Sequence, residues 1–298
     1  MPGILLLWVL APLPAFPDVA VTDDAGHAVL LRQPARRIVS LAPFVTELLF
    51  AAGAGGSVAG VSEFSDYPEA ARSLPRIGGG GGLDLEAILS LQPDLVIAWQ
   101  SGNPAQQVER LRSLGLAVYL SEPRRLEDIP ATLERFGRLA GTGPLAARES
   151  AAFQQRLAAL RRRYADRPEI SVFYQIWERP LMTVNGEHLI SDVIRLCGGR
   201  NVFSDLPVLA PQIAFEAVLA ADPDVMVAGS EAGVSSQPLG PWRAWPELAA
   251  VQAGRLYTIP RELLVRHTPR ILEGAERLCR LLEAARPADS AHVNRKTP

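Results

Sequence analysis

The sequence predicts an α/β protein with two Rossmann-like lobes joined by a single long α-helix, with a ligand cleft between the lobes. The first observation is an internal repeat: residues 85–98 and 215–228 align without a gap, and six of the fourteen positions are identical. The second is an alternation of short apolar runs with helical segments, which is typical of a mostly parallel sheet with helices on both faces. The third is a run of apolar residues at helical spacing over 144–164, between the two copies of the repeat.

Each copy of the repeat predicts a short helix, a Pro-Asp break and then a buried strand. The helix of each copy carries one glutamate, Glu86 in the first and Glu216 in the second. A solenoid needs shorter units and at least three of them, so this architecture is excluded. We therefore expect two lobes of similar design, and the cleft between them is where we expect the functional site.

The elements of the first lobe follow from apolar runs and the breaks between them. A hairpin is expected at 19–31, because Asp24-Ala25-Gly26 forms a turn sequence between two apolar runs. A helix is expected at 43–52, where Gly53 stops it. The remaining predicted strands are 37–41, 58–61, 94–98 and 117–120, and the remaining helices are 85–91, 104–114 and 126–140.

The long helix follows the Gly141-Thr142-Gly143 sequence and starts the second half of the chain. At 1.5 Å per residue it would be roughly 30 Å long, enough to cross a small domain. Because a continuous helix resists bending, we expect only small movements of the lobes when a ligand binds. The second lobe is predicted to contain strand 171–176, helix 189–196, the repeat copy, strand 256–259 and helix 269–285.

The two ends of the chain are expected to lie outside the lobes. Residues 1–17 are predicted to be a signal peptide, because the apolar run at 4–11 is too short to span a bilayer and small residues and prolines follow it. A buried N-terminal strand or a wrongly assigned start is the alternative. The polar residues 287–298 are expected to be disordered. The predicted domains are then an N-terminal lobe at 18–143, a linker helix at 144–166 and a C-terminal lobe at 167–286, and the mature protein is expected to be soluble.

Cys197 and Cys279 are the only cysteines of the chain. Cys197 ends an apolar helix, and Cys279 lies inside the last predicted helix. Two buried thiols and a disulfide are both compatible with these positions. Export favours the disulfide, because an oxidising compartment allows it to persist.

The composition and the motifs exclude several classes of function. With 48% apolar residues, 21% charged residues and a net charge of −2, the chain gives no support to a nucleic-acid partner, and no run of basic residues with interleaved aromatics is present. The four histidines are scattered along the chain, at 27, 188, 267 and 292, so a metal site is not expected. The glycine run 78–82 lacks the Lys-Ser/Thr of a phosphate-binding loop, and no nucleophile motif is present. We expect no catalytic activity, with an enzyme on a doubly wound α/β fold as the distant alternative.

Several short strings resemble the helical-backbone (Fe/B12) periplasmic binding proteins of ABC importers. These strings are residues 37–43, 46–47, 65–68, 84–86, 93–99 and 197–203. The resemblance extends over about residues 37–282, and it is greatest to the cobalamin-binding members of the family. It implies two α/β lobes joined by one long helix, with the ligand held between the lobes, in agreement with the pattern of elements.

The resemblance also implies roles for particular residues. Each lobe of the family carries a surface glutamate that contacts arginines of the membrane permease, and the matching residues are Glu86 and Glu216. A helix carboxylate favoured by the helix dipole is the alternative explanation for these two glutamates, and their occurrence in both copies of the repeat favours the permease contact. Cys197 and Cys279 match the family's disulfide, which favours the bridge over two free thiols.

In the ligand pocket, the resemblance assigns Trp99, Arg266 and Phe64, the last in place of a tyrosine. Two tryptophans of the cobalamin-binding members are replaced by Gly80 and Ala210. A substitute aromatic surface is expected from Trp177, for which packing in the lobe core is the alternative.

The resemblance therefore implies a monomeric periplasmic protein that delivers cobalamin or a related corrinoid to the permease dimer of an ABC importer. The corrinoid is the transported ligand, no cofactor is expected, and the membrane is met only through the permease. Haem or a ferric siderophore, carried by the same fold, is the alternative ligand. A siderophore usually needs several arginines in the cleft, for which Arg261 and Arg266 are the candidates.

Overall fold

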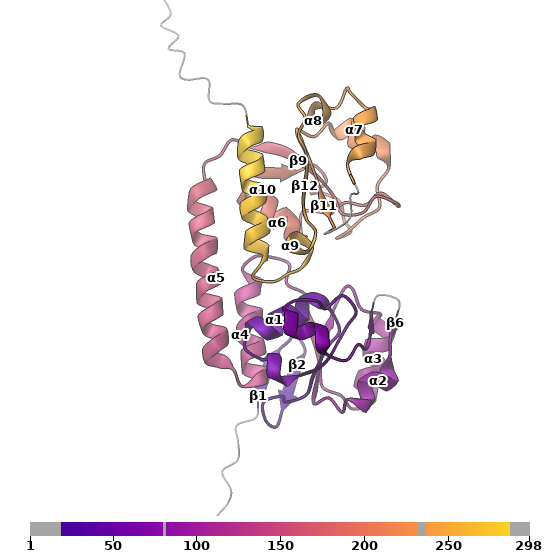
Figure 1. Cartoon of the computed structure of the whole chain (residues 1–298), viewed down its shortest axis with the longest axis vertical. Helices are drawn as coiled ribbons and strands as arrows, with labels where there is room; N and C mark the ends of the chain where they lie inside the picture. The colour runs from indigo at the N-terminus through magenta and orange to yellow at the C-terminus, as the bar shows by residue number, and fades with distance from the viewer. Residues whose placement is uncertain (1–18, 80–81, 232–236, 287–298) are drawn as a thin grey trace, which may run out of the picture.

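Two α/β lobes lie one above the other in the computed structural model, which describes residues 19–79, 82–231 and 237–286 (Figure 1). The predicted fold class is confirmed, because each lobe contains a parallel sheet and the long helix α5 (Gly143–Tyr164) joins them. The predicted signal peptide, Gly80 and the predicted tail at 287–298 lie outside the described residues. Within the described ranges, no helix is both long and apolar enough to cross a membrane.

The N-terminal lobe is built on a four-stranded parallel sheet in the order β4-β3-β7-β8. Its elements are β1 (Val19–Thr22), β2 (Ala28–Leu31), β3 (Ile38–Ser40), α1 (Pro43–Ala51), η1 (Gly55–Ser57), β4 (Val58–Val61), η2 (Glu69–Ser73), β5 (Gly78–Gly79), β6 (Gly82–Leu83), α2 (Leu85–Ser90), β7 (Leu95–Trp99), α3 (Ala105–Ser113), β8 (Val118–Ser121) and α4 (Asp128–Ala140). Along β7, Leu95 and Ile97 pack with α1 and α4, whereas Val96 and Ala98 pack with α2 and α3. Both faces of the sheet are therefore buried, as the continuous apolar runs of its strands require.

The C-terminal lobe repeats this design with the sheet order β10-β9-β11-β12, again parallel throughout. Its elements are β9 (Ile170–Gln175), α6 (Leu189–Leu196), β10 (Gly199–Asn201), α7 (Phe215–Ala221), β11 (Val225–Ser230), η3 (Gly240–Ala244), α8 (Ala249–Gln252), β12 (Leu256–Pro260), α9 (Glu262–Val265) and α10 (Ile271–Ala285). Along β11, Val225 and Val227 pack with α6 and α10, whereas Met226 and Ala228 pack on the side of α7.

The two copies of the internal repeat adopt the same backbone path. In each copy a short helix, α2 or α7, leads through a tight turn into a central strand, β7 or β11. The turn contains a non-glycine residue with positive φ at the same place in both copies, Gln92 at +47° and Asp222 at +37°. Such conformations are uncommon outside glycine, so their occurrence at equivalent positions shows that the repeat is structural as well as sequential.

The aspartate of each Pro-Asp pair accepts hydrogen bonds from residues at the start of the neighbouring strand. The Asp94 carboxylate accepts hydrogen bonds from the amides of Arg36 (2.8 Å) and Arg37 (3.1 Å), just before β3. The Asp224 carboxylate accepts from the amide (2.9 Å) and the hydroxyl (2.6 Å) of Ser171, at the start of β9. Each aspartate therefore links the start of a central strand to the start of the neighbouring parallel strand. This link gives a physical reason for the presence of the aspartate in both copies of the repeat.

Helix α5 runs along one side of both lobes (Figure 1). Its 22 residues give a length of roughly 33 Å at 1.5 Å per residue. Its buried apolar residues, among them Phe153 and Leu160, belong to one apolar cluster that also contains Phe136 of α4 and Leu278 of α10. A single core therefore extends from one lobe through α5 into the other.

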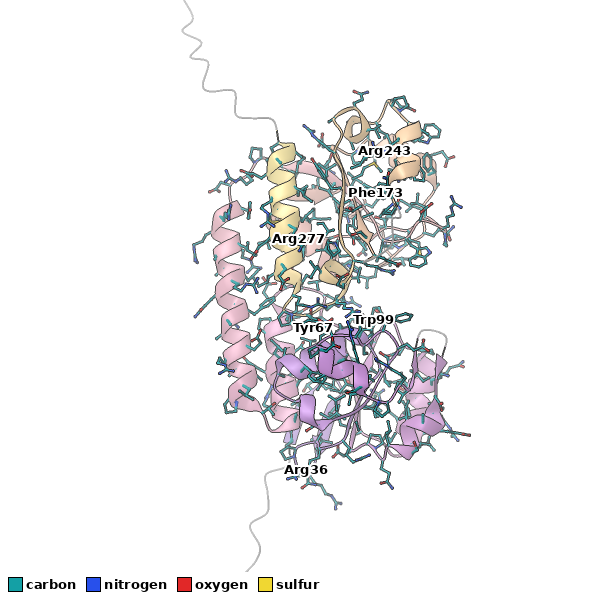
Figure 2. The ribbon with its side chains drawn as sticks, in the orientation of Figure 1. Arg36, Tyr67, Trp99, Phe173, Arg243 and Arg277 are labelled. Atoms are coloured by element: carbon teal, nitrogen blue, oxygen red, sulfur yellow. A yellow bond between two sulfur atoms is a disulfide. The ribbon has the colours of Figure 1, made fainter. Side chains whose placement is uncertain are left out.

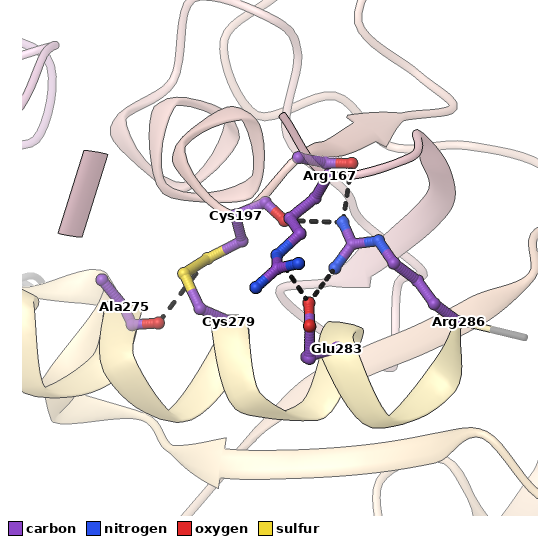
Figure 3. The surroundings of a disulfide bond; sticks show 7 residues. Arg167, Cys197, Ala275, Cys279, Glu283 and Arg286 are labelled. Atoms are coloured by element: carbon purple, nitrogen blue, oxygen red, sulfur yellow. Dashed lines mark hydrogen bonds and ion pairs between the residues drawn. A yellow bond between two sulfur atoms is a disulfide. The ribbon is translucent and has the colours of Figure 1, made fainter. Parts of the chain in front are cut away.

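Cys197 and Cys279 form a disulfide that joins the end of α6 to α10 (Figure 3). The predicted bridge is thus present, and both cysteines are fully buried. Beside it, Arg286 donates hydrogen bonds to the carbonyl of Cys197 (2.7 Å) and forms an ion pair with Glu283 (3.2 Å). The bridge and this arginine fix the end of α10 against the C-terminal lobe.

Candidate ligand-binding site

A cavity of about 450 Å³ opens at the carboxyl ends of β9, β11 and β12 in the C-terminal lobe. Ligands of open α/β sheets bind at this end of the strands, and the volume lies within the ~300–1,000 Å³ typical of ligand pockets. Its lining includes Gln175, Trp177, Glu178, Arg179, Glu231 and Arg261.

Trp177 and Arg261 form one wall of this cavity. The Arg261 guanidinium lies 5.0 Å from the centre of the Trp177 ring, within the range of a cation–π contact. The indole N–H of Trp177 donates to the carbonyl of Arg179 (3.0 Å), so the ring is oriented although 47% of the residue is exposed. The alternative assignment of Trp177 to the lobe core is therefore wrong, and its aromatic face is available to a ligand.

Gln175, at the end of β9, is a buried lining residue that two hydrogen bonds hold in place. Its side-chain amide donates to the carbonyl of Pro238 (2.8 Å) and accepts from the indole N–H of Trp242 (2.8 Å). Trp242 is buried and stacks on Phe215, with ring centres 4.1 Å apart. The cavity therefore rests on a packed aromatic core.

Trp99 ends strand β7 and lies on the face of the N-terminal lobe that is turned toward the C-terminal lobe (Figure 2). Its indole N–H donates to Glu122 (3.4 Å), and its amide donates to the side chain of Asn103 (2.6 Å). Gly102 packs directly on the indole, since a Cβ at that position would lie 1.9 Å from the ring. Phe44 meets the ring edge-on, with centres 5.8 Å apart. The ring is therefore fixed in place before any ligand arrives.

Phe64 lies on a loop between the two lobes and is 76% exposed. Its backbone has a positive φ of +61°, a conformation that is strained for an aromatic residue. The hydroxyls of Ser62 and Ser65 on either side of it are 3.1 Å apart and buried, and Ser65 also accepts a hydrogen bond from Thr46 (3.1 Å). This network holds the loop so that the Phe64 ring remains in solvent.

Arg266 crosses from the C-terminal lobe to the N-terminal lobe. Its guanidinium lies 2.7 Å from both Glu47 and Asp66, and it donates a hydrogen bond to the carbonyl of Phe64 (3.0 Å). Glu47 is buried and also pairs with Arg270 at 2.8 Å. The two lobes are thus joined by an ion-pair cluster of Glu47, Asp66, Arg266 and Arg270, called here the interlobe cluster.

The charges of this cluster stabilise one another. Burial disfavours the charged form of Arg266, but the hydrogen bonds and charges of Glu47 and Asp66 outweigh this and raise the pKa of Arg266. Burial also raises the pKa of the Asp66 carboxyl, whereas the hydrogen bond and charge of Arg266 lower it, and the net shift is downward. Arg266 and Asp66 are therefore both ionised at neutral pH.

Two histidines pack beside the interlobe cluster. His267 is buried against Phe44 of the other lobe, with ring centres 5.3 Å apart, and faces His188 at 5.9 Å. Burial lowers the pKa of His188 to about 4, and burial together with the charge of His188 lowers the pKa of His267 to about 3. The unprotonated Nδ1 of His188 accepts a hydrogen bond from the amide of Ile190 (3.1 Å), which caps α6. Both rings are therefore neutral in the folded protein.

Acidification is expected to destabilise the protein through these two histidines. Unfolding restores their ordinary pKa of 6.5, so below that pH the unfolded chain binds more protons than the folded chain. The free energy of unfolding should fall from about pH 6.5 toward about pH 4, by on the order of 3 kcal/mol for each histidine. Denaturant titrations at several pH values would measure this slope, and a His267→Gln variant should have a flatter one. An identical slope in the variant would contradict this assignment.

Glu86 and Glu216 are both exposed and are both the second residue of their helices, α2 and α7. In Figure 1 these helices lie on the side of the molecule opposite α5, one on each lobe. Asp84 caps α2 by accepting a hydrogen bond from the amide of Ala87 (2.9 Å), whereas α7 has no side-chain cap. Neither glutamate lines the cavity.

The structure brings together only some of the predicted ligand residues. Arg266 contacts the backbone of Phe64. Trp99 and His267 do not form an aromatic contact with each other, but the Phe44 ring contacts both of them. Trp177 alone among the predicted ligand residues lines the cavity, where it contacts Arg261.

The interlobe role of Glu47 and Arg270 was not predicted. A signal was present, because Glu47 is the one charged residue in the otherwise apolar helix α1, and a buried carboxylate needs a cation. The sequence could not say which arginine would supply it. No group of three His, Cys, Asp or Glu residues that could hold a metal ion is found in the part of the chain that the structure describes.

Three comparisons place this geometry among known proteins. A family model described as periplasmic binding protein matches residues 38–263. A vitamin B12-binding protein of Vibrio cholerae is 40% identical over 253 residues, which cover 85% of this chain and 91% of that protein. The crystal structure of a periplasmic vitamin B12 binding protein of Vibrio cholerae matches with a TM-score of 0.79 at 39% identity, over 85% of this chain and 98% of that one. A periplasmic heme-binding protein from Roseiflexus sp. RS-1 matches with a TM-score of 0.73 at 25% identity, over 84% of this chain and 99% of that one.

Proposed function

Because the chain belongs to the periplasmic binding protein family, we propose that it captures cobalamin or a related corrinoid in the periplasm and delivers it to an ABC importer. The observation that carries the proposal is an oriented tryptophan at the strand ends of each lobe, Trp99 in one and Trp177 in the other. A relative that shares 40% of its residues with this chain is named a vitamin B12-binding protein, which supports the same ligand class.

In the proposed mechanism the protein binds the ligand reversibly and does not convert it. The aromatic faces of Trp99 and Trp177 would bury the flat corrin ring, since large aromatic surfaces dominate such contacts. Polar groups at the strand ends, among them Arg261 and Glu231, would form hydrogen bonds with the amides at the edge of the ring.

The aromatic set differs from that of the cobalamin-binding members at two positions. Gly80 lies outside the described residues, and Ala210 is half-buried. The neighbouring Gly78 has a φ of +86°, and a Cβ there would lie 2.4 Å from the carbonyl of Gly82, so this hairpin requires glycine. The exposed ring of Trp177 is the surface that we propose in place of the missing tryptophans.

Delivery requires contact with a permease dimer, and we propose Glu86 and Glu216 as the contacts. One exposed carboxylate on each lobe suits a partner with two-fold symmetry. The protein would act as a monomer and meet the membrane only through this permease.

Calorimetric titration with cyanocobalamin, cobinamide, haemin and a ferric siderophore tests the ligand class directly. We expect both corrinoids to bind. Binding of haemin or of the siderophore alone would replace the corrinoid by that ligand as the transported solute.

Shortening either tryptophan is expected to weaken cobalamin binding. Trp99→Ala and Trp177→Ala should each lower the affinity roughly tenfold, because a large buried aromatic contact contributes about 1–3 kcal/mol. Trp245→Ala is the matched control, since Trp245 is partly exposed but packs on Phe215 away from the cavity. If both variants bind like wild type while the control also does, the ligand lies elsewhere.

A further inference from the structure

The arginine that joins the lobes is already paired with two carboxylates of the protein, Glu47 and Asp66. Arg266 directs its guanidinium at Glu47, Asp66 and the carbonyl of Phe64, at distances of 2.7 to 3.0 Å. The second cation of the interlobe cluster, Arg270, is held by Glu47 at 2.8 and 3.0 Å. Two carboxylates and two guanidinium groups thus balance each other at the junction of the lobes.

The cavity in the C-terminal lobe shows the same balance. Arg261 pairs with Glu231 at 3.2 Å while it stacks on Trp177. The other two charged residues of the lining, Glu178 and Arg179, pair with each other at 3.3 Å. The lining therefore has an aromatic surface and equal numbers of positive and negative groups.

A ligand with carboxylates at its edge binds unfavourably in such a site, for one of two electrostatic reasons. It must displace a protein carboxylate from an arginine, or lie close to that carboxylate and be repelled. A ligand with uncharged amides meets neither cost. Its N–H groups can donate to the protein carboxylates, and its carbonyls can accept from Arg261, without breaking an ion pair.

We propose that Asp66 and Glu231 determine specificity by neutralising Arg266 at the junction of the lobes and Arg261 in the cavity, so that the protein accepts rings with amide edges and rejects rings with carboxylate edges. This inference rests on the proposed function and adds a rule for which ligands of that class bind. Asp66 and Glu231 have side chains that are 55% and 58% exposed, so both are accessible to a ligand. Glu47 is buried between two arginines and serves the junction of the lobes.

The test compares two ligands that share the corrin ring and differ in the charge of its edge. Dicyanocobinamide carries amides around the ring, and dicyanocobyrinic acid carries carboxylates at the same positions. Haemin, a flat ring with two propionates, is the third probe. Affinities of wild type and of an Asp66→Asn, Glu231→Gln double variant would be measured by calorimetry. Both replaced groups are more than half exposed, so the variant should fold normally.

The double variant should bind dicyanocobyrinic acid at least about tenfold more tightly than wild type does, with dicyanocobinamide unchanged within about threefold. The gain should shrink between about 0.05 M and about 0.5 M salt, because partly exposed charges are screened. A Glu149→Gln, Glu273→Gln variant on α5 and α10 has the same change in net charge, made away from the cavity. It should bind all probes like wild type.

Equal affinities of wild type and double variant for the carboxylate ligand would overturn the proposal, as would an equal gain for both corrinoids. The proposed function has a separate readout, which is binding of dicyanocobinamide by wild type. If wild type binds no corrinoid, a tighter binding of haemin by the double variant still supports the charge rule, and unchanged haemin binding rejects it.

Discussion

Reversal of both surface carboxylates, Glu86→Arg together with Glu216→Arg, is expected to abolish transport while the affinity for the ligand stays within a factor of about two. Both groups are exposed at the start of helices on the side of the molecule opposite α5, and neither lines the cavity. If the permease surface is cationic, it attracts the two carboxylates of wild type. The two arginines of the variant carry the same sign of charge as that surface and would be repelled by it. Ligand uptake into vesicles that contain the permease, together with calorimetry of the isolated protein, would measure both effects.

A Glu149→Arg, Glu273→Arg variant is the matched control for this reversal. It makes the same change in net charge on α5 and α10, and it should transport normally. Single reversals should each weaken uptake, since either lobe would then lose its own contact. Equal loss of ligand binding in the isolated double variant would show that Glu86 or Glu216 acts in the cleft, and normal uptake would show that neither contacts the permease.

Removal of the disulfide is expected to have the largest effect on stability. Replacing Cys197 and Cys279 by alanine should lower the free energy of unfolding by about 2–5 kcal/mol, since the bridge closes a loop across many residues. The two cysteines are separated by 82 positions, and both are buried between α6 and α10. Guanidinium titration of the oxidised protein and of the double variant would give the difference.

Wild type treated with a reductant provides the control, because it should unfold at the same denaturant concentration as the double variant. Ligand affinity should be unchanged, as no residue of α6 or α10 lines the cavity. A midpoint that does not respond to reductant would contradict the prediction. Recovery of two alkylatable thiols from protein isolated from its native compartment would do so as well.

Most elements of secondary structure were predictable because their signals are local. The predicted strands and helices of the two lobes agree with the observed ones within about two residues, an error that is normal for element ends. The exceptions are short segments. Strand β10 was missed because the three residues Gly199–Asn201 are too few to show any periodicity. The hairpin of β5 and β6 was missed because a glycine run carries no pattern of apolar and polar residues.

The candidate site was predicted less completely than the fold. Trp99 was predicted as a ligand residue through the resemblance to the family, and Trp177 was predicted because it follows the first strand of the second lobe. Arg266 was identified as well, but as a ligand contact. Its pairing with Glu47 and Asp66 joins positions 219 and 200 residues apart, and no local pattern records such a distance.

The sequence by itself determined the two-lobed α/β architecture, the long connecting helix and the family. Periodicity, turn residues and an internal repeat are properties of neighbouring positions, and these fix local structure. The tertiary structure alone decided which charges meet. Whether Arg266 and Arg261 are free cations or neutralised ones depends on carboxylates that come from distant elements. Because Coulomb energies depend on separations of a few ångströms, the electrostatic character of the cleft emerges only when the lobes are folded against each other.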